Sequence, residues 1–299
     1  MKIEIAIEGP REALLILLQR AEGGAWRPEN QFERMEDSGE RSRIIFIQEE
    51  AGLDHALSRL SRIVTNLERT LFPENTFQFR TKNLAYAEPK GAGRRGGLYS
   101  PIPSLEIQSW DPSLKPTTDL DGIILDSKNA FGTGGHPTTR LCLECLETLA
   151  GNKTQDWGLE GREVLDFGCG TGLLAIAAVK MGASRAMGVD IVQDAARTAE
   201  RNVRLNGLTD KIIIRWGDWN QVHGRYDLIL ANLVASALLR SGGQISQYLK
   251  EGGRAVISGF SGKQMEDMER FFRATGLKTI YRSSLDVWGM LFMEHRSTI

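Results

Sequence analysis

The stretch from Asp166 to Gly172 constrains the fold of this chain most strongly, because three glycines alternate within the sequence Asp-Phe-Gly-Cys-Gly-Thr-Gly. A short apolar run, residues 163–165, precedes it, and an apolar segment, residues 173–178, follows it. This order predicts a strand, a tight loop and a helix. Glycines are needed there because the backbone must turn sharply and approach a ligand closely. Thr171 can cap the new helix.

The spacing of these glycines separates two classes of nucleotide loop. A dinucleotide loop has the pattern Gly-x-Gly-x-x-Gly, whereas here the glycines alternate, Leu173 follows them and Asp166 stands before the first one. This pattern resembles the nucleoside loop of S-adenosylmethionine-dependent methyltransferases. The alternatives are a strand-to-helix turn that binds no nucleotide and an irregular NAD loop. The elements downstream argue against both alternatives.

Asp190 ends the next predicted strand, residues 186–191. It stands about twenty residues after the glycine loop, where a ribose-binding carboxylate belongs. A carboxylate there can accept hydrogen bonds from both ribose hydroxyls and would repel a 2′-phosphate, which argues against NADP. The alternative role is a cap for the following helix, residues 194–206. The position after the glycine loop favours the ribose role.

Two further polar residues follow strands. The strand 212–216 leads to Asp218. Its carboxylate could bind the adenine amino group or only stabilise a turn, and the sequence favours neither role over the other. The strand 226–231 leads to Asn232, whose amide both accepts and donates hydrogen bonds at the sheet edge where active sites lie. The Asn-Pro-Pro-aromatic tetrad of many amino-directed methyltransferases is absent. Its absence weakens a DNA-base or glutamine methyltransferase interpretation.

The segment from Asn129 to Arg140 is too rich in Gly and Thr for an ordinary linker, and a predicted helix follows it. Its motif Phe-Gly-Thr-Gly-x-His-Pro-Thr-Thr, the glycine loop and Ala-Asn-Leu at 231–233 together resemble the PrmA family, the methyltransferases of large-subunit ribosomal protein eleven. The resemblance runs from about Leu105 to the C-terminus and is weak before it.

The resemblance assigns roles to individual residues. It places S-adenosylmethionine against Thr139, Gly168, Asp190 and Asn232, and it makes Phe131, Gly132 and Thr133 a lid over the cofactor. We also expect Asp166, Gly170 and Asp218 to contribute to the cofactor site.

Departures from the family pattern concern other positions. The family motif commonly has Thr where this chain has Gly135, and a family strand usually has Pro where this chain has Gln108. The segment 90–97 is also rich in Gly and Arg. These departures leave the cofactor site intact and bear on the protein substrate.

Two residues are candidates for catalysis, Asn232 and His136. Asn232 is the better candidate for orienting an acceptor amine. His136 is the only histidine in a motif, but a histidine in a glycine-rich loop more often hydrogen-bonds the backbone than transfers protons. We predict no metal site, because Cys142 and Cys145 lie within a helical pattern without a second zinc-spaced pair.

Composition favours an intracellular enzyme. The chain has 299 residues and a net charge of −1, which predicts two domains and gives no field that attracts nucleic acid or an acidic membrane. No segment reaches the apolar length of a membrane span, no signal-peptide core is present, and three cysteines make no disulfide framework. We expect a cytoplasmic monomer.

The predicted domain organisation has three parts. Residues 1–82 have the order βαββαβ, with strands at 2–8, 31–36, 42–48 and 76–81 and helices at 10–22 and 54–71, which is a ferredoxin-like substrate-recognition domain. Residues 83–103 form a flexible linker. Residues 104–299 form a seven-stranded Rossmann-like methyltransferase domain, whose last strands, 278–283 and 288–295, make an antiparallel end.

These features predict an S-adenosylmethionine-dependent methyltransferase that modifies lysine ε-amines or an N-terminal amine of a ribosomal protein. A second hypothesis changes the acceptor to another protein or a small amine. A third, of a different class, is a cofactor-binding regulator without activity, which the intact residue set disfavours.

Overall fold

The computed structural model describes residues 2–10, 13, 14, 17, 32–38, 41–49, 78–83, 96–113, 122–127, 130–151 and 157–295. The chain divides into two compact units, Met1–Ala87 and Glu88–Ile299.

The first unit contains an antiparallel sheet of four strands in the order β2-β3-β1-β4. Its strands are β1 (Lys2–Gly9), β2 (Phe32–Ser38), β3 (Arg41–Glu49) and β4 (Gln78–Asn83), at the four predicted positions. Leu14 N donates to Pro10 O at 3.0 Å, at the start of the first predicted helix. The second predicted helix, 54–71, lies outside the described residues. The ferredoxin-like assignment therefore stays a prediction.

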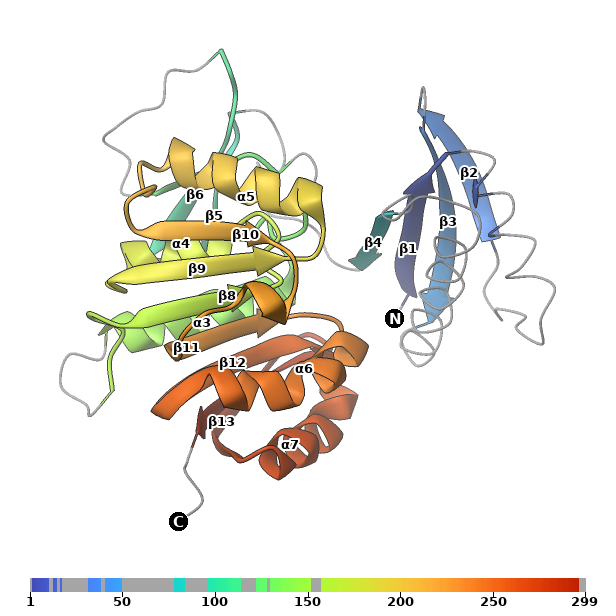
Figure 1. Ribbon diagram of the computed structural model, residues 1–299. Helices are drawn as coiled ribbons and strands as arrows, with labels where there is room; N and C mark the ends of the chain where they lie inside the picture. Colours follow the sequence, from blue (N-terminus) through green and yellow to red (C-terminus); the bar gives the residue numbers. More distant parts are fainter. Residues whose placement is uncertain are drawn as a thin grey trace. The chain divides into compact units, whose positions relative to one another are not determined.

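The second unit is built on a seven-stranded sheet in the order β10-β9-β8-β11-β12-β14-β13 (Figure 1). The strands are β8 (Glu163–Phe167), β9 (Arg185–Asp190), β10 (Ile212–Trp216), β11 (Tyr226–Asn232), β12 (Leu249–Ser261), β13 (Leu277–Leu285) and β14 (Trp288–His295). Strand β14 is antiparallel to both β12 and β13, and all other neighbouring pairs in the sheet are parallel. The predicted sheet with its antiparallel end is confirmed.

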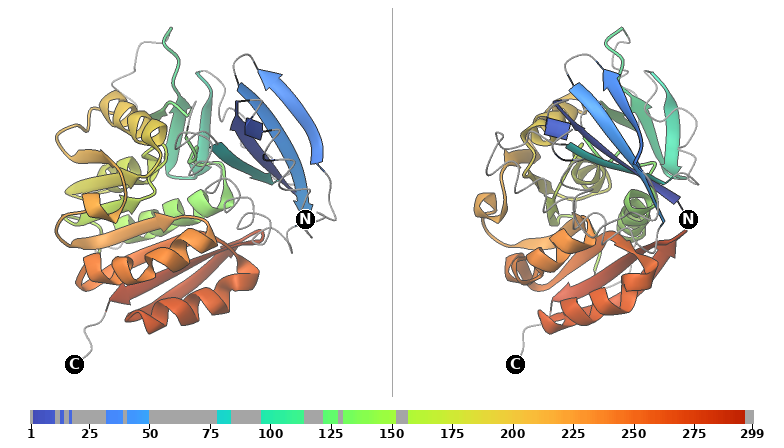
Figure 2. Two further views of the ribbon diagram at one scale, coloured as in Figure 1. Left: turned by 45° about the vertical axis from the view of Figure 1, so that its right-hand side comes forward. Right: turned by 90° about the vertical axis from the view of Figure 1, so that its right-hand side faces the viewer.

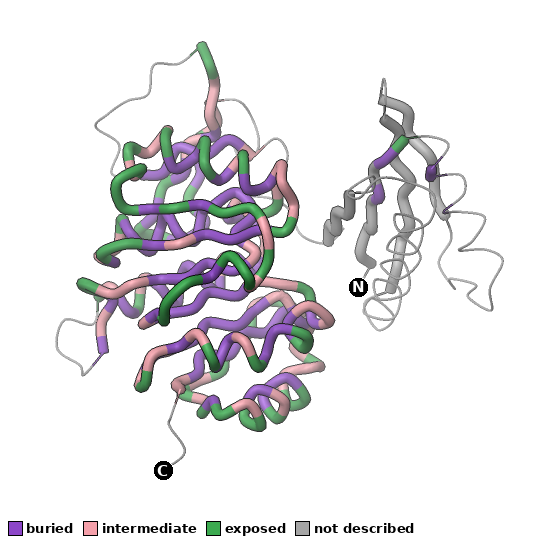
Figure 3. The backbone as a smooth tube through the Cα atoms, viewed as in Figure 1, coloured by how far each residue is buried: buried purple, intermediate pink, exposed green. Residues whose placement is uncertain are grey.

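Helices cover both faces of this sheet. The helices α3 (Pro137–Gly151), α4 (Leu173–Lys180) and α5 (Gln193–Leu205) pack side by side on one face. The helices α6 (Ala235–Tyr248) and α7 (Met265–Ala274) pack together on the other, as the orange and red helices of Figure 2 show. The covered strands are mostly buried (Figure 3), and Phe260 of β12, Phe292 of β14 and Phe272 of α7 are among the largest fully buried side chains. Burial on both faces suits parallel strands with apolar sequences.

A small sheet precedes α3. It contains β5 (Leu98–Ile102), β6 (Leu105–Ser109) and β7 (Ile123–Leu125), with β5 antiparallel and β7 parallel to β6. Strand β5 lies inside the predicted flexible linker, so that prediction is corrected for residues 98–102. The reason is that Tyr99 and Ile102 are buried, and apolar side chains that pack in this way fold with the second unit.

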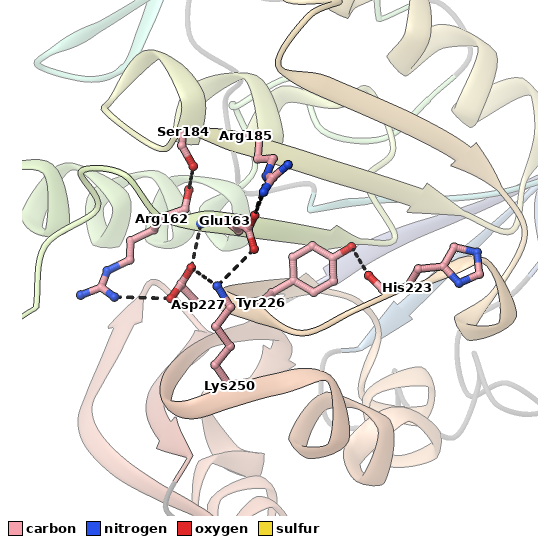
Figure 4. A network of polar contacts seen from close by, with 8 residues as sticks. All are labelled: Arg162, Glu163, Ser184, Arg185, His223, Tyr226, Asp227 and Lys250. Carbon is pink, nitrogen blue, oxygen red and sulfur yellow. Dashed lines mark hydrogen bonds and ion pairs between the residues drawn. The ribbon is translucent and has the colours of Figure 1, made fainter.

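A charged network joins the strand starts at the amino end of the sheet (Figure 4). Lys250 Nζ lies 2.8 Å from Asp227 Oδ2 and 3.1 Å from Glu163 Oε2. Arg162 Nη1 is 3.4 Å from Asp227 Oδ1, and Arg185 pairs with Glu163. The hydrogen bond from Lys250, and next that from Arg185, hold the pKa of Glu163 below its ordinary value. Burial raises the pKa of Asp227, but its hydrogen bonds to Lys250 and to the Glu163 amide outweigh burial and lower it.

Candidate active site

The glycine loop joins β8 to α4 with left-handed backbone at Gly168, Gly170 and Gly172, whose φ angles are 78°, 55° and 78°. Only glycine adopts such angles without strain. A Cβ at Gly170 would lie 2.2 Å from the carbonyl oxygen of Phe131. The loop therefore needs glycine for its turn, as predicted, and also because the segment at Phe131 lies directly against it.

Asp190 ends β9 beside this loop and is buried. Its Oδ2 accepts the Gly170 amide at 2.8 Å, and its Oδ1 accepts the Val192 amide at 2.8 Å. Burial raises its pKa, although both backbone hydrogen bonds act in the opposite direction. Helix α5 has Val192 as its N-cap and no side-chain cap. The geometry therefore leaves the carboxylate at the loop, with further lone pairs for hydroxyl donors.

Asp166 lies beneath the loop, and its Oδ2 accepts the Ala175 amide in the first turn of α4 at 3.1 Å. Complete burial raises its pKa to about 7. Thr171, the predicted cap, contributes only a 3.4 Å hydrogen bond from the Leu173 amide, and its hydroxyl donates to Gly132 O at 2.6 Å. The Asp166 side chain therefore accepts one amide in the first turn of α4, the helix for which the sequence predicted Thr171 as a cap.

Asn232 and Thr139 come together from distant parts of the chain. Asn232 ends β11, Thr139 lies in the first turn of α3, and Asn232 Nδ2 donates to Thr139 Oγ1 at 3.2 Å. Thr139 is buried and Asn232 is half-buried. Both lie at the carboxyl edge of the parallel strands, where ligands of open α/β sheets bind.

His136 caps α3. Its carbonyl oxygen accepts the Thr139 and Arg140 amides at 3.0 Å, and its Nδ1 lies 3.3 Å from the Thr138 amide nitrogen and 2.8 Å from Thr138 Oγ1. Burial lowers its pKa to about 4, so the ring is neutral near neutral pH, with Nδ1 as the acceptor. This geometry supports the backbone-bonding role that the sequence favoured. A group with this pKa is a weak base toward a lysine ammonium.

The His136 ring lies between two aromatic side chains. Its centroid is 5.4 Å from that of Phe131 and 4.9 Å from that of Trp288, both in edge-to-face geometry. Trp288 is buried, and its Nε1 has no hydrogen-bond partner within the described part of the chain. Phe131 is 51% exposed. Trp288 escaped the sequence analysis because only the fold brings it to this edge.

The predicted lid is held through its carbonyl oxygens. Tyr99 OH donates to Thr133 O, and the Thr171 amide donates to Phe131 O at 2.9 Å. Gly132, whose φ is 107°, lies between them. Whether this segment covers a cofactor stays a prediction.

Asp218 shows turn chemistry. Its Oδ1 accepts the Asn220 amide at 2.9 Å and caps the short 3-10 helix η2 (Trp219–Gln221). Nearby, Ile191 is 64% exposed, and its carbonyl oxygen accepts Trp216 Nε1 at 3.1 Å. Ile191 directly follows Asp190, and Trp216 ends β10 two residues before Asp218. Strand periodicity alone did not single out these two side chains. The adenine role of Asp218 stays a prediction.

The comparisons with known proteins agree with this architecture. The family described as Ribosomal protein L11 methyltransferase (PrmA) matches residues 59–296. The chain belongs to the PrmA family. The Ribosomal protein L11 methyltransferase of Chromobacterium violaceum is 39% identical over 158 residues, 52% of this chain and 49% of that protein. The protein of that name from Geobacter sulfurreducens is 38% identical over 183 residues, 61% of this chain and 57% of that protein.

A solved structure extends the likeness to the fold. The crystal structure of ribosomal protein L11 methylase from Lactobacillus delbrueckii subsp. bulgaricus is 28% identical and has a TM-score of 0.57. It covers 67% of this chain and 99% of its own. The chain spans about half the length of the curated relatives it matches. The PrmA resemblance and the predicted methyltransferase fold are confirmed, while the roles of single residues stay predictions.

Two asparagines at the end of α5, the buried Asn202 and the half-buried C-cap residue Asn206, hold backbone segments in place behind the glycine loop. Asn202 exchanges hydrogen bonds with the backbone of Asp126 at 2.8 and 2.9 Å, and its Nδ2 also donates to Thr171 O at 2.8 Å. Asn206 pairs likewise with the backbone of Ile124. Asparagines on an otherwise polar helix look solvent-facing in sequence, so their anchoring role was missed.

Over the ranges that the structure describes, no group of three or more His, Cys, Asp or Glu side chains could hold a metal ion. No helix among those residues is long and apolar enough to cross a membrane. The three cysteines, Cys142, Cys145 and Cys169, are buried and form no disulfide.

Proposed function

We propose that the protein is an S-adenosylmethionine-dependent methyltransferase that modifies lysine ε-amino groups, an N-terminal α-amino group, or both, on a large-subunit ribosomal protein. The observation that carries the proposal is the contact between Asn232 and Thr139 at the same sheet edge as the glycine loop and Asp190. The proposed substrate implies a cytoplasmic enzyme, and we expect a monomer.

The residues present fit the cofactor. Asp190 is buried, and its described hydrogen-bond partners are backbone amides rather than a cation. A carboxylate in this state favours hydroxyl donors and a nearby positive charge. Thr139, Gly168, Gly170 and Asn232 would complete the binding surface, and Asp166 would lie below it.

Methyl transfer from a sulfonium is an in-line displacement, in which the cofactor would supply the electrophilic methyl group on its sulfur. The protein must orient the acceptor amine, for which alignment contributes about 7–11 kcal/mol in favourable cases. Because Asn232 Nδ2 donates to Thr139, its Oδ1 is directed to accept an N–H of that amine. Desolvation favours the neutral amine of a lysine, whose ordinary pKa is about 10.4.

Incubation with labelled S-adenosylmethionine and ribosomal proteins from the same source, followed by mass spectrometry, tests the proposal. We expect label on one large-subunit protein, on amine nitrogens. Asn232→Ala should lower the rate by about 10–100-fold through loss of alignment. Label on other proteins alone or on small amines would favour the second acceptor class, and cofactor binding without transfer would favour a regulator.

The first unit is the proposed recognition module. Presenting one flexible amine requires a docking surface away from the chemistry, whose binding energy offsets the cost of orientation. A chain that begins at Glu88, where the second unit begins, should bind the cofactor and fail to methylate its protein substrate. Transfer to the same protein at an unchanged rate would contradict this role.

A further inference from the structure

Thr171 stands where the glycine loop meets the segment Phe131–His136, here named the strap. It is fully buried, and its polar groups all have partners. Its amide donates to Phe131 O at 2.9 Å, its hydroxyl donates to Gly132 O at 2.6 Å, and its carbonyl oxygen accepts Asn202 Nδ2 at 2.8 Å. One loop residue therefore holds two consecutive strap carbonyls.

Glycines allow this contact from both sides. A Cβ at Gly170 would lie 2.2 Å from Phe131 O, and one at Gly132 would lie 3.1 Å from Thr171 Oγ1. The two backbones therefore touch, and the hydroxyl of Thr171 fills the remaining space. Such a contact transmits a displacement of one segment directly to the other, because packed interiors have little free volume.

The contact connects the two sides of the proposed site. On one side, Gly170, the neighbour of Thr171, donates its amide to Asp190. On the other side, the Phe131 ring contacts His136, whose carbonyl oxygen accepts the Thr139 amide. Asn202 anchors Thr171 to α5 from behind. The position of the loop therefore fixes the strap.

We propose that Thr171 is a positioning residue that couples the cofactor loop to the strap, so that an ordered loop sets Phe131 and the capped start of α3 for the acceptor amine. This inference rests on the proposed function for its consequence in catalysis. The hydrogen bonds themselves concern the protein without ligand. Thr171 acts through the strap and does not contact the reacting atoms.

Thr171→Val keeps the shape and the amide but removes the hydroxyl, which donates to Gly132 O at 2.6 Å and accepts the Leu173 amide only at 3.4 Å. Hydrogen exchange of the strap amides in the ligand-free protein should be about 3–10-fold faster, the range expected for one lost hydrogen bond. With cofactor, kcat for methyl transfer should fall by about 3–10-fold while the Kd of S-adenosylhomocysteine changes by less than about twofold. Thr171→Ser restores the donor and should restore both readouts.

Thr198→Val is the matched control, because it removes a hydroxyl that donates to a carbonyl oxygen, that of Asp194, at 2.8 Å on α5. It should leave strap exchange and kcat unchanged. Strap exchange in Thr171→Val equal to that of the wild type, or no recovery in Thr171→Ser, would overturn the coupling. If the wild type neither binds S-adenosylhomocysteine nor transfers methyl groups, the proposed function fails, and exchange in the ligand-free variants still decides the coupling.

Discussion

Carboxyl groups at the two ends of the parallel strands have different partners, and their pKa values shift in opposite directions. At the amino end, Glu163 and Asp227 meet Lys250 and arginines, and their pKa values are lowered. At the carboxyl end, the described hydrogen bonds of Asp166 and Asp190 come from backbone amides, and burial raises their pKa values. The first arrangement stabilises the ionised carboxylates, whereas the second leaves Asp166 and Asp190 with backbone amides as their described partners, and we propose that Asp190 in this state binds a ligand.

Asp190→Ala tests the carboxyl end and carries the largest expected effect. The affinity for S-adenosylhomocysteine should fall by about 10–100-fold, because buried polar partners lose their acceptor. Unfolding in urea should change less, because the buried carboxylate also has a desolvation cost that its removal relieves. Calorimetric titration and urea unfolding of one preparation give both values, and unchanged affinity would contradict the role of Asp190.

Asp227→Ala tests the amino end and should give the reverse result. The side chain is 14% exposed, and its loss leaves the Glu163 amide without an acceptor and Lys250 with one carboxylate fewer. The free energy of unfolding should fall by about 2–3 kcal/mol. Asp227→Asn, which keeps an acceptor, should lose less. If Asp227→Ala unfolds like the wild type but binds the cofactor poorly, the proposed difference between the two ends of the strands is wrong.

The pH dependence of stability should differ between the two ends. The lowered pKa values of Glu163 and Asp227 give stability that is present above their ordinary values and is lost as the pH falls. Asp166 has the opposite sign, because its pKa rises from 3.8 to about 7. Its favourable contribution is complete below pH 3.8 and is lost as the pH rises toward 7.

Asp166→Asn isolates this contribution, because asparagine resembles the protonated acid. Relative to the wild type, the variant should gain about 1–3 kcal/mol of stability between pH 4 and pH 7. Urea unfolding at both pH values measures the difference. A difference that does not change with pH would show that Asp166 is ionised throughout, as at the amino end.

Substitutions of two tryptophans, Trp157 and Trp288, should give the smallest difference in stability. Trp157 lies under the guanidinium groups of Arg162 and Arg254 at 4.9 and 4.7 Å, whereas Trp288 has an unpartnered Nε1 within the described residues. Trp157→Phe should destabilise the protein by about 0.5–1 kcal/mol through a weaker cation–π contact. Trp288→Phe removes a buried donor without a partner and should be neutral or slightly stabilising. Equal losses in thermal unfolding would contradict this contrast.

The sequence predicted the parts that depend on local backbone requirements. The alternating glycines located the loop, and the strand that follows it located Asp190. Helix α6 was missed because Gly242 and Gly243 interrupt its pattern. In the fold, a Cβ at Gly242 would lie 2.3 Å from the Phe271 ring of α7, so that glycine serves helix packing. This requirement is tertiary, and no local pattern reveals it.

Parts of the site were missed for the same reason. Asn202 and Trp288 acquire their roles from partners distant in the sequence. Thr139 was identified through the family resemblance and Asn232 also through its place at the end of a strand, but only the fold shows that they touch. Side chains that act through long-range contacts carry no periodic signal of their own.

Calorimetric titration of the wild-type protein with S-adenosylhomocysteine and, separately, with NAD tests the central claim most directly. The claim is that the carboxyl end, with its alternating glycines and Asp190, binds an S-adenosyl nucleoside. We predict saturable binding of S-adenosylhomocysteine, weakened by about 10–100-fold in Asp190→Ala and kept in Asp227→Ala, and no binding of NAD. Tighter binding of NAD than of S-adenosylhomocysteine would contradict the account.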